Sequence, residues 1–124
     1  MPRPDNLLKT PEFKTNLLQA DNHATTNDLP LWPTRIVWVG LIHNVSVAKR
    51  FAQRRSNYKD SKAWACYTRL VDTGVFSEEP EGLVYTEGVE PWESDPMLWL
   101  DTLIRIADGA EPPEHLPRYA NAPT

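Results

Sequence analysis

Histidine and cysteine are the residues of this sequence whose types could support catalysis or metal binding, and their spacing argues against both. A general base needs a nucleophile or an acid within reach, and no sequence pattern around His43 supplies one. The three histidines and the single cysteine, Cys66, lie far apart, without the close spacing of zinc ligands. Cys66 lies in an apolar stretch, where cysteine is usually a small buried hydrophobe. We therefore expect no enzyme activity, no metal and no cofactor.

The ionisable side chains are instead segregated by sign along the chain. From Arg35 to Arg69 there are eight basic side chains and one acid, whereas from Asp72 to Asp101 nine acids occur without a lysine or arginine. The net charge of -4 conceals this separation because the two blocks nearly cancel. Such a separation either joins two halves of one fold or presents two surfaces to different partners.

The basic block contains candidate nucleic-acid-binding residues. Lysine and arginine neutralise phosphates and release counterions, and interleaved aromatic side chains can stack on unpaired bases. The candidates are Lys49, Arg50, Arg54, Arg55, Lys59 and Lys62. In the alternative interpretation, the neighbouring Phe51 and Tyr58 are core residues and the charges form a solvated helix face.

The acidic block contains candidate protein-binding residues. A carboxylate surface can dock a basic partner protein, and aromatic side chains are frequent at binding patches. The candidates are Glu78, Glu79, Glu81, Trp92 and Trp99. The alternative is intramolecular: these acids lie over the basic helix, and each exposed pair contributes less than about 1 kcal/mol.

The first half of the chain predicts one helix, a loop and a buried apolar segment. Thr10 is a favourable N-cap, so a helix should begin at the following proline. Residues 21–28 are rich in Asn and Thr and predict a loop, and the prolines within 29–33 predict an extended segment. The β-branched run 36–42 favours a buried strand, although Thr34 as an N-cap would permit a short helix.

Two helices and a hairpin are predicted to carry the charged residues. One helix runs from Val45 to about Arg55, capped by Asn44 or Ser46, with a core stripe of Val47, Ala48, Phe51 and Tyr58. After a polar break, a second helix begins at Asp60 or Ser61 and ends at Gly74, with a strand as the alternative. The flanks of the turn-like segment 79–82 then predict a short hairpin, made by Val75-Phe76 and Leu83-Val84-Tyr85.

The last predicted element is an amphipathic helix from Met97 to Asp108. Asp95 is the expected N-cap and Gly109 the expected stop. Its apolar arc is wide, which is typical of a helix that packs against more than one neighbour. This face is therefore a candidate for self-association as well as for the core, and its members are Trp99, Leu100, Leu103, Ile104, Ile106 and Ala107.

The order helix, turn, helix, glycine stop and hairpin resembles the centre of winged helix-turn-helix domains. The residues that carry the resemblance are Val47-Ala48, Phe51-Ala52, Leu70, Gly74-Val75-Phe76 and Gly82-Leu83-Val84-Tyr85, and they span about a third of the chain. The resemblance implies that the basic segment contacts the nucleic-acid backbone and that the hairpin is the wing. The glutamates of that wing would repel phosphates, which favours a protein partner.

We therefore expect a small α+β, mainly helical single domain over 10–109, with a disordered tail over 1–9 and a Pro-rich disordered tail over 110–124. No apolar run approaches the roughly 20 residues of a membrane helix, and the N-terminus lacks the apolar core of a secretion signal, so a cytoplasmic protein without a membrane partner is expected.

The leading functional prediction is a non-enzymatic binding or regulatory domain that acts through protein–protein contacts or self-association. The first alternative is a winged-helix-like nucleic-acid-binding regulator that uses residues 49–62. The second alternative is a non-catalytic subunit of a larger enzyme complex.

Overall fold

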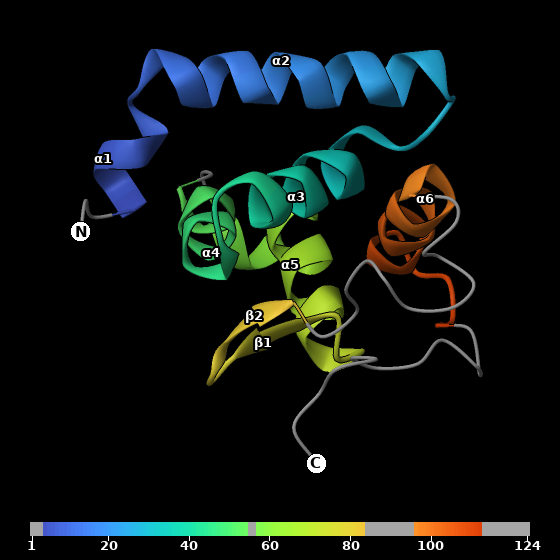
Figure 1. Ribbon diagram of the computed structural model, residues 1–124. Coiled ribbons are helices and arrows are strands. Elements are labelled where there is room, and N and C mark those ends of the chain that lie inside the picture. The colour runs from blue at the N-terminus through green and yellow to red at the C-terminus, as the bar shows by residue number, and fades with distance from the viewer. Residues whose placement is uncertain (1–3, 55–56, 84–95, 113–124) are drawn as a thin grey trace.

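The computed structural model describes residues 4–54, 57–83 and 96–112, which form helices and one antiparallel hairpin (Figure 1). The mainly helical α+β architecture predicted from the sequence is confirmed. In chain order the elements are α1 (Pro4–Leu8), α2 (Pro11–Thr26), α3 (Leu31–Ile42), α4 (Val45–Gln53), the 3₁₀ helix η1 (Tyr58–Asp60), α5 (Lys62–Asp72), β1 (Phe76–Glu78), β2 (Glu81–Leu83) and α6 (Pro96–Ala107).

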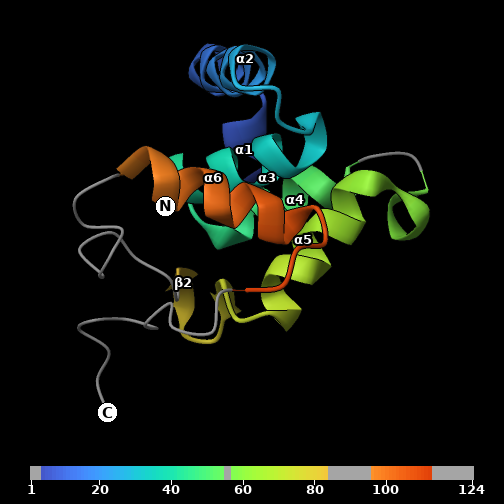
Figure 2. The same cartoon turned by 90° about the vertical axis from the view of Figure 1, so that its right-hand side faces the viewer.

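Helix α3 lies at the centre of the molecule and contacts α2, α4, α5 and α6. Helix α2 covers one side of α3, while the hairpin lies at the opposite end of the molecule, beyond α5 (Figures 1 and 2). A helix surrounded in this way is apolar on nearly all faces, which removes the periodic signal of an amphipathic helix.

The predicted strand over 36–42 is therefore wrong, and this segment is the main part of α3. In the described residues no strand pairs with this segment, since the sheet there consists of β1 and β2 alone. Helix α3 also starts earlier than the Thr34 cap implies, at Leu31, so 31–33 are helical rather than extended. Pro33 is tolerated there because the first helical N–H groups have no partner within the helix.

The predicted loop over 21–28 is wrong for most of its length, because α2 continues to Thr26 and the turn occupies Asn27 and Asp28 alone. Tertiary contacts extend the helix: Ala24 is buried, and Arg35 of α3 donates two hydrogen bonds to the Asp21 carboxylate, at 2.7 and 2.9 Å. The predicted tail over 1–9 contains α1, whose Leu7 and Leu8 pack against the core.

The predicted N-caps Thr10, Asn44 and Ser61 and the predicted stops Gly74 and Gly109 are confirmed. The side chains of Thr10, Asn44 and Ser61 each accept a hydrogen bond from the backbone N–H three residues later, at 2.8–3.1 Å. Gly74 and Gly109 follow α5 and α6 with φ angles of 83° and 115°, the left-handed backbone that ends many helices. The predicted cap Asp95 lies outside the described residues.

The predicted hairpin is confirmed over Phe76–Leu83, with Phe76 opposite Leu83 and Glu78 opposite Glu81. Its predicted extension to Val84 and Tyr85 lies outside the described residues. Tyr58 belongs to η1 and not to the stripe of α4, whose members Val47, Ala48 and Phe51 are buried as predicted.

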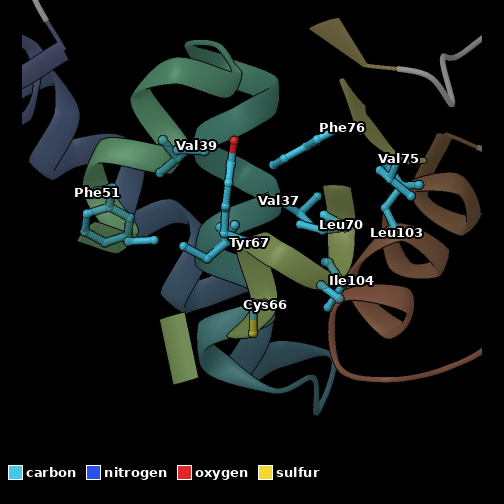
Figure 3. Packing of buried hydrophobic residues seen from close by; sticks show 14 of the residues in the cluster. Val37, Val39, Phe51, Cys66, Tyr67, Leu70, Val75, Phe76, Leu103 and Ile104 are labelled. Atoms are coloured by element: carbon cyan, nitrogen blue, oxygen red, sulfur yellow. The ribbon is translucent and has the colours of Figure 1, made fainter. Parts of the chain in front are cut away.

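One core joins the central helices to the hairpin, as Figure 3 shows for side chains of α3, α4, α5, β1 and α6. Phe76 is 1% exposed and its ring lies over Gly40 of α3. A Cβ atom at Gly40 would lie 2.9 Å from Cε1 of Phe76 and closer still to Cζ. The missing side chain at position 40 is therefore what allows the hairpin to pack against α3.

Candidate functional site

The basic and acidic blocks contact each other through an exposed ion pair. Lys49 Nζ on α4 lies 2.7 Å from Glu78 Oε2 on β1, and both side chains are 41% exposed. Arg69 of the basic block donates hydrogen bonds to the last carbonyls of α6 and the turn after it, at 3.4 Å to Ile106, 3.2 Å to Gly109 and 2.9 Å to Ala110. The intramolecular interpretation of the charge separation thus accounts for part of it.

The six candidate nucleic-acid-binding residues do not form one basic surface without neighbouring carboxylates. Lys49 is paired with Glu78, and Lys62 Nζ lies 3.0 Å from Oδ1 of Asp108, the residue that follows α6. Arg50 on α4 and Arg54, the residue that follows α4, are exposed but each has an interaction partner, and Lys59 is exposed in η1. Arg55 lies outside the described residues.

Two hairpin glutamates are held by hydrogen bonds. Glu78 accepts from the hydroxyl of Tyr67 on α5, at 2.9 Å, as well as from Lys49. Glu81 accepts from the backbone N–H and the hydroxyl of Ser46, both at 2.8 Å. A carboxylate at the first turn of a helix is favoured by the N–H groups and the dipole of that helix. Glu81 therefore ties β2 to the start of α4.

Glu79 differs from its neighbours because it lies exposed at the hairpin turn. Among residues 4–54, 57–83 and 96–112, no side chain forms an ion pair with it. The remaining candidates are aromatic: Trp99 is only 7% exposed and belongs to the core, and Trp92 lies outside the described residues.

A hollow of about 520 Å³ lies between the hairpin and the helices that hold it. We call it the hairpin groove, and its lining residues are Val45, Ser46, Lys49, Tyr67, Glu78, Glu79 and Glu81. The structure thus brings all three candidate glutamates to one groove. Sequence reasoning missed Tyr67, because nothing in the sequence indicates that the hydroxyl of this buried tyrosine reaches a glutamate.

The pKa values of two residues in the hairpin groove are shifted in opposite directions. The hydrogen bond from Lys49, followed by the one from Tyr67, lowers the pKa of Glu78 below its usual range. Burial raises the pKa of Tyr67, and its hydrogen bond to Glu78 raises that pKa further. At neutral pH the groove therefore holds a carboxylate that accepts and a phenol that keeps its proton.

The residues considered for catalysis do not form a catalytic arrangement in the described chain. The His43 ring packs against Phe13, with 5.5 Å between ring centroids. His23 Nε2 lies 2.9 Å from Asp101 Oδ1, a contact that joins α2 to α6. Cys66 is 1% exposed, and burial raises the pKa of its thiol to about 11, which disfavours the reactive thiolate.

No known family, curated protein or solved structure matches this chain. The winged-helix resemblance therefore rests on the order of elements alone. Within the described residues, no group of three or more His, Cys, Asp or Glu side chains could hold a metal ion. None of the helices in this same part of the chain is long and apolar enough to cross a bilayer.

The lowered pKa of Glu78 predicts a specific acid dependence of stability. Because the folded state binds fewer protons at Glu78 than the unfolded state does, the free energy of unfolding should fall as the pH drops below about 4.5, through the folded-state pKa. Glu78→Gln removes this contribution, so the variant should lose less stability than the wild type between neutral pH and about pH 3. Urea unfolding at several pH values measures the difference.

Lys49→Met is the matched control, because it keeps Glu78 but removes the main cause of its lowered pKa. Its loss of stability on acidification should lie between those of the wild type and Glu78→Gln. Identical acid dependence of all three proteins would contradict the prediction.

Proposed function

We propose that this chain is a small binding domain that performs no chemistry of its own and docks a basic segment of a partner protein in the hairpin groove. The observation that supports the proposal is the charge of the groove. Three glutamates, Glu78, Glu79 and Glu81, line it together with one lysine, Lys49. A segment rich in lysine or arginine complements that charge, which favours specific and rapid association.

The groove is also ordered before a partner arrives. Glu78 is held by Tyr67 and Lys49, and Glu81 by Ser46, so two of the three carboxylates are already fixed. Side chains that are fixed in advance lose less conformational entropy on binding. Glu79, exposed at the turn, can adapt to the basic side chains of the partner.

The nucleic-acid alternative has less support. Phosphates bind where lysine and arginine are free to replace counterions, whereas Lys49 and Lys62 each lie beside a carboxylate. The glutamates next to Lys49 would repel a phosphate backbone. No particular contact favours the role of a subunit in a larger enzyme complex.

Charge reversal at the hairpin turn tests the proposal. The probe is a fluorescently labelled peptide of alternating arginine and serine, and its affinity is measured by anisotropy at low salt. Glu79→Lys places a like charge opposite the peptide and should weaken binding about fivefold, which corresponds to about 1 kcal/mol. Binding should also weaken as salt is added.

Glu12→Lys is the matched control, since Glu12 is an exposed acid on α2, at the other end of the molecule from the hairpin (Figure 1). It changes the net charge by the same amount and should alter the affinity less than about twofold, because Glu12 does not line the groove and salt screens exposed charges that make no direct contact. Equal effects of the two reversals, or tighter binding of a DNA or RNA oligonucleotide than of the peptide, would overturn the proposal.

A further inference from the structure

A second hollow adjoins the hairpin groove, on the other side of the Lys49–Glu78 pair. It measures about 210 Å³, and we call it the α5 hollow. Lys49, Tyr67 and Glu78 line both hollows, so this ion pair and the tyrosine separate them. The rest of the wall comes from one helix, with Trp64, Thr68, Val71 and Asp72 of α5.

The residues from α5 share one helix face because they are spaced four, seven and eight positions after Trp64. The indole of Trp64 is held in place by two aromatic neighbours. It stacks on Tyr67, with ring centroids 5.4 Å apart and an interplanar angle of 25°, and Tyr58 meets it edge-on at 5.2 Å. The α5 hollow therefore has a rigid aromatic wall.

Carboxylates complete the α5 hollow. Glu78 lies at one side and Asp72, which is exposed, at another. Among the residues that the structure describes, no side chain pairs with Asp72. The cation already present is Lys49, whose ammonium group marks where a positive charge is accepted beside Glu78.

We propose that the α5 hollow binds the guanidinium group of an arginine in the partner's basic segment, and that this arginine displaces Lys49 from Glu78. The inference rests on the proposed function and names the side chain that the site selects. A guanidinium is planar, stacks on aromatic rings and can donate two parallel hydrogen bonds to a carboxylate. A lysine ammonium carries the same charge without the planar shape, so arginine is preferred.

The displacement exchanges one exposed ion pair for another. Lys49 is long and 41% exposed, so its ammonium group can move into water once Glu78 has a new partner. Glu78 keeps its hydrogen bond from Tyr67, which holds the carboxylate in position during the exchange. Lys49 thus acts as an internal competitor that weakens binding of any cation at this site.

The test compares two lysine variants against two peptides, one of alternating arginine and serine and one of alternating lysine and serine. Lys49→Met removes the internal competitor and should tighten binding of the arginine peptide about five- to tenfold. Lys62→Met removes the same charge from a lysine–carboxylate pair outside both hollows and should change the affinity less than about twofold. The wild type should bind the arginine peptide several-fold more tightly than the lysine peptide.

Asp72→Asn probes the α5 hollow itself, since Asp72 lines this hollow and not the hairpin groove. It should reduce the preference for arginine over lysine. Equal effects of Lys49→Met and Lys62→Met, or equal affinity for the two peptides, would overturn the arginine site. If the arginine site were overturned but Glu79→Lys still weakened peptide binding, the proposed function of the hairpin groove would stand. If neither peptide bound to the wild type, both proposals would be overturned.

Discussion

Replacing Phe76 by alanine is expected to lower the free energy of unfolding by about 3–5 kcal/mol, the usual cost of removing a buried aromatic ring. Phe76 begins β1, is 1% exposed, and packs between Gly40 of α3 and the Tyr67 ring, whose centroid is 6.1 Å away. Without the ring, a cavity remains between the hairpin and the helices, because the rigid helix backbones cannot collapse fully into it.

Urea unfolding followed by circular dichroism measures this loss. Leu83→Ala is a suitable comparison, because Leu83 pairs with Phe76 across the hairpin but is only partly buried. Its loss of stability should be clearly smaller than that of Phe76→Ala. A Phe76→Ala variant that lost less than about 1 kcal/mol would show that the hairpin is not anchored through this ring.

The second large effect is expected from Gly40→Ala, which should lower the free energy of unfolding by about 1–2 kcal/mol. Alanine is intrinsically better than glycine within a helix by about 1 kcal/mol. Against this gain, the new methyl group would overlap the Phe76 ring, and overpacking of a filled core costs about 1–3 kcal/mol or more. The overlap is severe enough for the packing cost to exceed the helix propensity.

A double variant separates these two contributions. When Phe76→Ala has already removed the ring, the atoms that a methyl group at position 40 would overlap are gone, and the helix propensity should dominate. Gly40→Ala should then stabilise the protein by about 0.5–1 kcal/mol, so its effect changes sign. If Gly40→Ala destabilised both backgrounds equally, the contact with Phe76 would not be the cause.

The sequence predicted the helix ends better than the helix interiors. Thr10, Asn44 and Ser61 cap the N–H groups of their own helices, and this interaction depends on neighbouring residues alone. Segments 21–28 and 36–42 were predicted incorrectly because partners distant in the sequence decide their structure. Arg35 holds Asp21 in α2, and helices on several sides surround the apolar run of α3.

The candidate site was predictable in charge but not in shape. The acidic composition of the hairpin identified Glu78, Glu79 and Glu81 as a group, and a predicted hairpin implied that they would lie close together. Which of them would be held internally depends on Ser46 and Tyr67, whose positions follow from the packing of α4 and α5 around α3. The width of the apolar face of α6 likewise left open whether Trp99 faced a partner or the core, and it faces the core.

The buried thiol of Cys66 has one further consequence. Thiol reagents attack the thiolate, and burial suppresses both access to this sulfur and its ionisation. Cys66 therefore becomes reactive toward thiol reagents when α5 separates from the core, and it remains unreactive while the packing is intact. Since this sequence contains one cysteine, the labelling rate reports how often the centre of the protein opens, without any engineered probe.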